Sequence, residues 1–398
     1  MNSTKKAKGS VIQWIKTLDS VLIAKSRMLN NDVKTEKCKI AAFDLDGTLI
    51  KTKGKHVHSK DKHDWLWWDS MIPKRLEKLN NEGYQIVILS NQNGLRKFNM
   101  INDFKYKMEN ILSQVNSPIL FMAALEKDMY RKPMTGMWDW LNTHIYTNID
   151  KMQSLYVGDA AGREVDWKPN KKKDHSCGDR KFAANLQINF YTPEEFFLNE
   201  PKTTHFSWKG FDANQYLSLE LPLYTPQDTP LFNREQKREV IICVGYPASG
   251  KSRFVEKYLV KERGYIHINQ DTLKTKDKCI KRCKEALENS TSSIVIDNTN
   301  PERSTRAIYI KLAQEAKAPV RCFYFGDNMD LAQHNNYYRA LYQQQDPKRL
   351  LSSIVFHKFK KSFQPPTLSE GFEEIKQIHF VFDESEKEKE IWKKWWTA

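Results

Sequence analysis

The chain has 398 residues, of which 40% are hydrophobic, and its 64 lysines and arginines against 49 aspartates and glutamates give a formal net charge of +15. This apolar content excludes a disordered chain, no apolar run approaches the ~18 residues of a membrane span, and six cysteines without a C-x-x-C pair argue against a disulfide framework. We therefore expect a soluble intracellular protein of two or three domains, without a membrane segment, whose charge favours an anionic partner such as nucleic acid.

Four segments follow one another along the chain. Residues 1–36 are polar with one weak amphipathic stretch, and they predict an N-terminal extension. Across 37–200, short apolar strands alternate with helices, which indicates an α/β domain with a mainly parallel sheet and functional loops at the carboxyl ends of its strands. Residues 201–237 are rich in Pro and Thr and predict a connector. The α/β rhythm restarts over 238–398 and predicts a second parallel sheet.

The motif FDLDGTL places Asp44 and Asp46 directly after an apolar strand. A carboxylate such as Asp44 can attack a phosphoryl group and form an aspartyl-phosphate. Asp46, two residues further on, can protonate the leaving alkoxide and then deprotonate water. A phosphate dianion beside two carboxylates needs a cation, so the motif implies Mg²⁺.

Three later positions complete this set. Ser90 ends the strand of VILSNQ and offers a hydroxyl to phosphate, Lys132 in YRKPMTGMW can neutralise phosphate and Asp44, and Asp159 in YVGDAAGR can bind Mg²⁺. A further acidic partner is Asp174 or Asp179, between which spacing does not decide. This order of motifs resembles the haloacid dehalogenase superfamily of phosphatases.

A second phosphate motif, GYPASGKS, follows the apolar strand VIICV. Gly245 and Gly250 let backbone N–H groups wrap the phosphates of a nucleotide, Lys251 reaches the β- and γ-phosphates, and Ser252 holds Mg²⁺. The pattern therefore predicts a P-loop that binds the phosphates of a nucleotide.

Two further positions favour phosphoryl transfer over hydrolysis. Asp271, at the end of the next strand, can accept a proton from an acceptor hydroxyl. Asp297 occupies the usual place of a second acidic residue, although its asparagine neighbours could position groups instead. The run AQHNNYYRAL predicts a lid, with Arg339 as a candidate clamp on the phosphates; a solvated helix is the alternative.

Together the two halves resemble the bifunctional polynucleotide kinase 3′-phosphatases, a family of DNA end-repair enzymes. The resemblance covers nearly the whole chain from about Cys38 and is carried by strings such as GYQIVILSNQNG, VGDAAGR and FQPPTLSEGFEEI. It implies a haloacid dehalogenase-like 3′-phosphatase domain over 37–200 and a P-loop 5′-hydroxyl kinase domain over 238–398. DNA with 5′-hydroxyl and 3′-phosphate ends is the implied partner, with Mg²⁺ and ATP.

The resemblance also assigns roles, and two positions depart from it. It implies a Mg²⁺ site that includes Asp44, Asp46 and Asp159. Gln270 and Tyr337 stand where animal members carry arginines, which weakens the expected stabilisation of the phosphoryl group in the kinase. Because only about 36 residues precede the phosphatase segment, we expect a fungal-type member without a forkhead-associated module.

The resemblance further implies a nuclear location, and we expect a monomer. Alternatives are a 3′-phosphatase whose weak kinase domain only holds DNA, a non-catalytic scaffold, and a kinase and phosphatase for small metabolites. DNA or RNA preference, strand or nick preference and protein partners stay open. The side chains expected to contact polynucleotide phosphates are Arg96, Lys168, Lys171, Lys172, Lys173, Lys358, Lys360 and Lys361.

Overall fold

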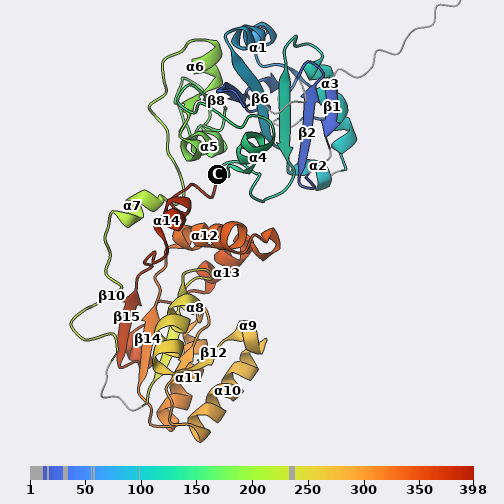
Figure 1. Ribbon diagram of the computed structural model, residues 1–398. Helices are drawn as coiled ribbons and strands as arrows, with labels where there is room; N and C mark the ends of the chain where they lie inside the picture. Colours follow the sequence, from blue (N-terminus) through green and yellow to red (C-terminus); the bar gives the residue numbers. More distant parts are fainter. Residues whose placement is uncertain are drawn as a thin grey trace, which may run out of the picture. The chain divides into compact units, whose positions relative to one another are not determined.

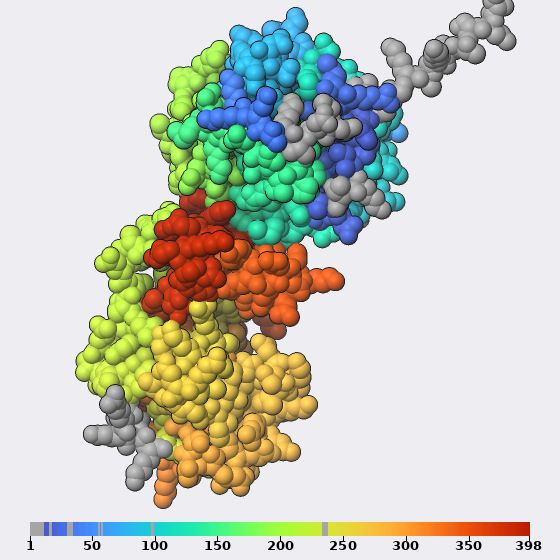
Figure 2. Space-filling view, viewed as in Figure 1, coloured from blue at the N-terminus to red at the C-terminus, as the bar shows by residue number. Residues whose placement is uncertain are grey.

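The computed structural model describes residues 12–15, 18–29, 35–54, 56, 59–97, 99–232 and 238–398. They form two units, one of residues 1–210 with 394–398 and one of residues 211–393. Each unit is built around its own mainly parallel sheet with helices on its faces (Figure 1). This confirms the predicted α/β class for both halves of the chain. In the space-filling view the residues of each unit are closely packed (Figure 2).

The first unit contains a seven-stranded sheet in the order β1-β2-β7-β6-β3-β8-β9. The five strands from β7 to β9 are parallel, whereas β1 and β2 are antiparallel to their neighbours. A small hairpin, β4–β5, follows β3. The strands are β1 (Ile12–Ile15), β2 (Val21–Ser26), β3 (Lys39–Phe43), β4 (Ile50–Lys51), β5 (Leu66–Trp67), β6 (Tyr84–Asn91), β7 (Ile119–Ala124), β8 (Leu155–Val157) and β9 (Asn189–Tyr191).

The segment expected to be an N-terminal extension differs from that expectation, because it supplies strands β1 and β2. Val21 and Ile23 are buried, and β2 pairs with β7 along five residues. The backbone of the short apolar run VLIAKS pairs with β1 on one side and β7 on the other, which a weakly amphipathic pattern does not reveal. Residues 1–11 and 30–34 of the extension lie outside the described residues.

Helices cover both faces of this sheet because alternate strand residues point to opposite sides. Ala41 and Phe43 pack in one core with α1 and α3, whereas Ile40 and Ala42 pack in the other with α4 and α5. Strands buried on both faces are typical of parallel sheets. The helices are α1 (Ile72–Asn81), α2 (Gly94–Lys97), α3 (Ile101–Leu112), α4 (Gly136–His144), α5 (Gly178–Leu186) and α6 (Pro193–Phe197).

The second unit contains a six-stranded sheet in the order β10-β15-β14-β11-β13-β12, parallel except for the edge strand β10. β10 comes from the predicted connector, so part of that segment belongs to the sheet. The strands are β10 (Tyr224–Thr225), β11 (Val240–Val244), β12 (Ile266–Ile268), β13 (Ile294–Ile296), β14 (Val320–Tyr324) and β15 (Glu374–Ile378).

The helical elements of the second unit lie on both faces of its sheet and in the excursion between β14 and β15. None of the described helices in either unit is long and apolar enough to cross a membrane. They are α7 (Ala213–Leu217), α8 (Lys251–Phe254), η1 (Val255–Lys261), α9 (Gln270–Leu273), α10 (Lys276–Asn289), α11 (Arg303–Glu315), α12 (Met329–Tyr337), η2 (Tyr338–Gln343), η3 (Pro347–Arg349), α13 (Ser353–Ser362), η4 (Leu368–Glu370) and α14 (Glu386–Trp392).

The segment after α14 returns to the first unit. Asn185 on α5 exchanges two hydrogen bonds with the backbone of Trp395, at 2.9 and 2.8 Å. The ammonium of Lys181 donates to the carbonyl of Thr397 at 2.9 Å, and the Trp395 ring stacks on Trp208 with centroids 5.2 Å apart. The C-terminal segment is therefore held against α5 and Trp208 of the first unit.

Candidate active sites

Three carboxylates meet at the carboxyl edge of the first sheet. Asp44 directly follows β3, Asp159 follows β8, and Asp179 lies in the first turn of α5. One oxygen of each lies within 4.8 Å of the others. Gly158 makes this approach possible, since a Cβ there would lie 2.4 Å from Oδ2 of Asp179. The structure therefore selects Asp179 from the two acidic residues that the sequence left open.

Asp174 has a different role. Its carboxylate accepts hydrogen bonds from the backbone N–H groups of Ala161 and Arg163 and from Nε of Arg163, the last at 2.9 Å. Asp174 therefore anchors the loop after β8 through the buried guanidinium of Arg163.

Lys132 joins two of the clustered carboxylates. Its ammonium lies 2.6 Å from Oδ1 of Asp44 and 2.8 Å from Oδ1 of Asp179, and it also lies 2.6 Å from the hydroxyl of Tyr156. The side chain is 2% exposed, so the pairs lie in a medium of low dielectric. The sequence predicted the contact with Asp44; Tyr156 was missed because it is an ordinary buried strand residue by pattern.

The charge balance of this cluster fits a bound cation. Burial raises the pKa of Asp44 from 3.8 to about 7 against the opposing charge of Lys132, with a smaller rise from Asp179. Burial and the charge of Asp44 also raise the pKa of Asp159 well above its usual range. Oxygen ligands in a buried acidic cluster suit Mg²⁺. The residues present therefore fit the predicted metal, and Asp44, Asp159 and Asp179 are those that would hold it.

Asp46 lies apart from this cluster, because its carboxylate turns toward polar groups of neighbouring elements. Nε2 of Gln92 donates to Oδ2 of Asp46 at 2.5 Å and to the hydroxyl of Ser90 at 3.0 Å. The ammonium of Lys107 lies 3.8 Å from Oδ1 of Asp46. Of the described residues, the grouped metal-ligand side chains do not include Asp46, so its assignment as a metal ligand stays a prediction.

Arg96 is engaged elsewhere in this structure. Its guanidinium contacts the carboxylate of Glu126 and the carbonyl of Asp19, neither of which belongs to the carboxylate cluster. Its assignment to a substrate phosphate stays a prediction. Ser90, by contrast, is buried and connected through Gln92 to Asp46.

In the second unit the predicted P-loop follows β11 and ends at the start of α8. Gly250 caps the helix with a φ of +97°, a conformation that favours glycine. The ammonium of Lys251 donates to the loop carbonyls of Gly245, at 3.1 Å, and Tyr246. Burial lowers the pKa of Lys251 to about 8 against the opposing charge of Asp297. This cradle fits the phosphates of a nucleotide.

Asp297 is held beside the P-loop by the neighbouring strand. Its Oδ2 lies 3.0 Å from Nε2 of His267 and accepts from Nδ2 of Asn269 at 2.9 Å. Burial raises the pKa of Asp297. The hydrogen bond from His267 and the charge of Lys251 lower this pKa by more than burial raises it, so it lies below its usual value of 3.8. Asp297 and Ser252 are thus the residues that would hold Mg²⁺ in the second unit.

Asp271 and Arg339 lie within electrostatic reach of each other. Asp271 is exposed in the first turn of α9, and its charge raises the pKa of Lys251 and of Arg339, although burial leaves both net lowered. Arg339 lines a cavity of about 210 Å³ with Gly250, Lys251 and Ser252. The structure therefore places the P-loop and the predicted lid residue Arg339 on one cavity, which Asp271 does not line. Gln270 is exposed, and its backbone N–H bonds Asn298, so the effect of its substitution stays a prediction.

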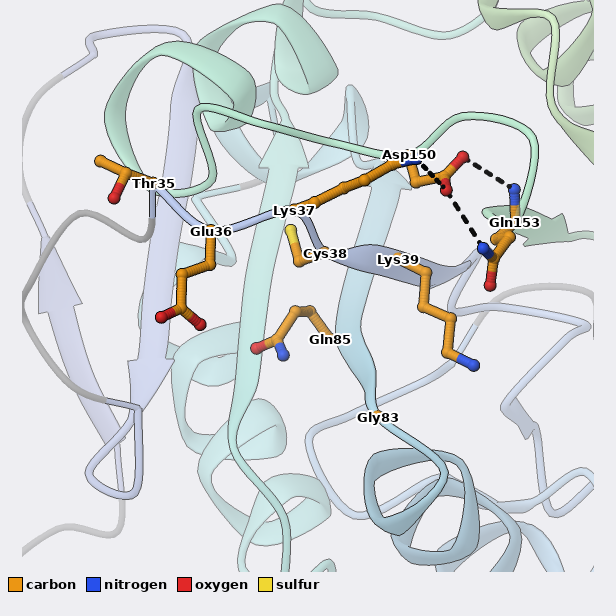
Figure 3. Close-up of a pocket in the computed structure, with 9 residues that line it drawn as sticks. All are labelled: Thr35, Glu36, Lys37, Cys38, Lys39, Gly83, Gln85, Asp150 and Gln153. Carbon is orange, nitrogen blue, oxygen red and sulfur yellow. Dashed lines mark hydrogen bonds and ion pairs between the residues drawn. The ribbon is translucent and has the colours of Figure 1, made fainter.

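A larger cavity of about 660 Å³ lies at the opposite, amino edge of the first sheet (Figure 3). Lys39 and Gln85 border it at the starts of β3 and β6, and an ion pair joins Lys37 to Asp150 at 2.9 Å. None of the predicted site residues lines it. The predicted chemistry therefore concerns the carboxylate cluster rather than this cavity.

The folds and sites together define a two-part phosphoryl-transfer protein, with a haloacid dehalogenase-like phosphatase unit followed by a P-loop kinase-like unit. Family profiles agree: one described as "Polynucleotide kinase 3 phosphatase" matches residues 39–197, and one described as "AAA domain" matches 240–366. The chain belongs to the family of bifunctional polynucleotide phosphatase/kinases, as the relatives below show.

Two relatives match over nearly their whole length. A bifunctional polynucleotide phosphatase/kinase of Schizosaccharomyces pombe is 41% identical over 373 residues, which cover 93% of this chain and 85% of that protein. A putative bifunctional polynucleotide phosphatase/kinase of Acanthamoeba polyphaga mimivirus is 33% identical over 96% of this chain and 94% of that protein. A polynucleotide 3′-phosphatase of Saccharomyces cerevisiae is 28% identical and covers only 40% of this chain, although 87% of that protein.

Proposed function

We propose that this protein repairs DNA break ends by removing a 3′-phosphate and by transferring the γ-phosphate of ATP to a 5′-hydroxyl. The observation that carries the proposal is the presence of two separately built phosphoryl sites in one chain. The first has the carboxylate cluster with Lys132. The second has the P-loop and Arg339 on one cavity, with the charge of Asp271 acting on Lys251 and Arg339. Each site has its own acidic group, so each reaction can proceed without the other.

In the phosphatase, Asp44 is the nucleophile and forms the aspartyl-phosphate with the incoming phosphoryl group. Lys132, at 2.6 Å, offsets the charge of that carboxylate and of the phosphate oxygens. Asp46 gives a proton to the departing 3′-oxygen and then takes one from the water that hydrolyses the intermediate. Mg²⁺, when bound by the cluster, supplies positive charge that stabilises the developing negative charge on the phosphate.

In the kinase, the P-loop backbone and Lys251 bind the donor phosphates. Asp271 accepts the proton of the 5′-hydroxyl as that oxygen attacks the γ-phosphorus. Arg339, which lines the same cavity as Lys251, stabilises the charge on the transferred group. Mg²⁺ at Ser252 and Asp297 would supply further positive charge there.

Basic side chains support a polynucleotide rather than a small metabolite as the substrate of both sites. In the first unit Lys171, Lys172 and Lys173 are exposed, whereas Lys168 pairs with Glu200 at 2.7 Å. On α13 of the second unit, Lys358, Lys360 and Lys361 are exposed. Such side chains gain by releasing counterions from nucleic acid. A nuclear location and a monomeric state are also part of the proposal. They rest on the family resemblance and on the expectation that the protein is soluble.

The test uses two oligonucleotides and two single-site variants of the full chain. Asp44→Asn should abolish phosphate release from a 3′-phosphate DNA oligonucleotide and leave phosphorylation of a 5′-hydroxyl oligonucleotide intact. Lys251→Ala should do the reverse. RNA oligonucleotides of the same sequence, measured in parallel, test the preference for DNA. Phosphate release by Asp44→Asn at the wild-type rate would refute the phosphatase assignment.

A further inference from the structure

Lys107 is a buried lysine that no motif of the sequence indicated. It lies on α3, is 5% exposed, and donates from its ammonium to the hydroxyl of Ser59 at 2.8 Å. The same ammonium lies 3.8 Å from Oδ1 of Asp46. A buried ammonium is costly unless a charge of opposite sign compensates it, and Asp46 supplies that charge in its ionised form, the form left after it gives up a proton.

The second oxygen of this carboxylate is held from the other side. Nε2 of Gln92, just beyond the end of β6, donates to Oδ2 of Asp46 at 2.5 Å. The side chain of Asp46 is 51% exposed, so its own loop leaves it free to turn toward solvent. The amide and the ammonium thus restrict a carboxyl group whose function in proton transfer depends on its orientation.

We propose that Lys107 is a positioning residue of the phosphatase, which holds the carboxyl group of Asp46 against Gln92 so that its proton faces the leaving oxygen. This inference rests on the proposed 3′-phosphatase function. In the step concerned, the bond between phosphorus and the 3′-oxygen breaks as the bond between Asp44 and phosphorus forms. The proton of Asp46 passes to the 3′-oxygen, and the product leaves as an alcohol. Ser59 fixes the lysine from the side of the loop between β4 and β5.

Two substrates whose leaving groups differ in basicity distinguish a positioning role of Lys107 from other roles. A 3′-oxygen leaves as a strongly basic alkoxide unless it is protonated, so it depends on the orientation of Asp46. The leaving group of p-nitrophenyl phosphate is a weakly basic phenolate that departs without a proton. Loss of Lys107 should therefore slow the reaction of the 3′-phosphate oligonucleotide and leave the reaction of p-nitrophenyl phosphate nearly unchanged.

The experiment measures release of the leaving group in the first turnover of the full-length protein, which isolates the formation of the aspartyl-phosphate. Lys107→Met should lower the rate for a 3′-phosphate oligonucleotide by about 10- to 100-fold, which is part of the ~10²–10⁴-fold that general acid–base catalysis supplies. The p-nitrophenolate burst and the KM for the oligonucleotide should change less than about twofold, and Lys107→Arg should restore part of the rate. Lys105→Met on the same helix, whose ammonium lies over the ring of Trp14, is the matched control.

Three results would overturn the inference: equal losses on both substrates, a raised KM with unchanged turnover, which would make Lys107 a polynucleotide contact, or no effect. If Lys107→Met does not fold, as thermal melting would show, Ser59→Ala takes its place and should cause the same selective loss, about two- to fivefold. Equal rates for Ser59→Ala and wild type would then overturn it. A wild-type protein that releases no phosphate from the oligonucleotide would refute the proposed function itself.

Discussion

Raising the pH of a Mg²⁺-free solution from 5 to 8 should destabilise the phosphatase unit through Asp44. The pKa of this carboxyl is 3.8 as a free side chain and about 7 in the folded unit, because burial outweighs the charge of Lys132. The folded state therefore binds more protons than the unfolded state across this window, and stability falls as the pH rises. From pH 5 to 8 the loss is about 3 kcal/mol, which lowers the melting temperature of a unit of this size by roughly 6 to 12 °C.

Thermal unfolding of the full-length protein in a chelator, followed by circular dichroism, measures this effect. Asp44→Asn should remove the part of the pH dependence that Asp44 contributes, because the carboxamide does not titrate, whereas Asp159, whose pKa burial also raises, keeps its own part. The variant should melt at a higher temperature than wild type at pH 8. Asp271→Asn makes the same chemical change at an exposed site of the other unit and should leave the dependence unchanged. Added Mg²⁺ should raise the melting temperature of wild type at pH 8 more than at pH 5. The reasoning fails if wild type and Asp44→Asn lose equal stability between pH 5 and 8.

Other perturbations should act on one function at a time. Asp271→Asn should lower 5′ phosphorylation by ~10²–10⁴-fold with unchanged ATP affinity by calorimetry, whereas weakened ATP binding with normal transfer would contradict a base. Gly158→Ala should lower kcat/KM for a 3′-phosphate oligonucleotide by about 100-fold, since its Cβ would displace Asp179, while Gly54→Ala in an open loop should be neutral. Neutralising the three exposed lysines at 171–173 should make the slope of log affinity against log salt shallower by roughly 2 to 3; an unchanged slope would exclude them as phosphate contacts.

The sequence predicted best those site residues that local chemistry fixes. Asp44 and Lys251 stand in motifs whose residue types and spacing define a phosphate site, and both lie where the pattern placed them. The choice of Asp179 over Asp174 depends on which carboxylate a long-range ion pair engages, and Arg163 engages Asp174 at 2.9 Å. The spacing of the residues along the chain does not show which aspartate pairs with Arg163. The sequence could therefore name both acids but not choose between them.

Local sequence patterns could not identify the residues that support the phosphatase site. Lys107 lies on the buried face of α3 between Phe104 and Ile111, where the pattern favours an apolar side chain, and only the tertiary fold shows that its ammonium lies near Asp46. Strand β2 was hidden for a similar reason, because its partner β7 lies roughly a hundred residues away in sequence. The class of each domain, by contrast, followed from the repeated alternation of strand and helix, which does not depend on any single contact.

The return of residues 394–398 to the phosphatase unit ties the maturation of one activity to the synthesis of the other. The ribosome makes residues 211–393 before the segment that Asn185 and Lys181 bind on α5. The same helix begins beside Asp179, a member of the carboxylate cluster. A nascent chain can therefore form the contacts between α5 and residues 394–398 only after the whole kinase unit has been translated. A chain that stops within the kinase region should thus lack the contacts that residues 395–397 make with Lys181 and Asn185 on α5.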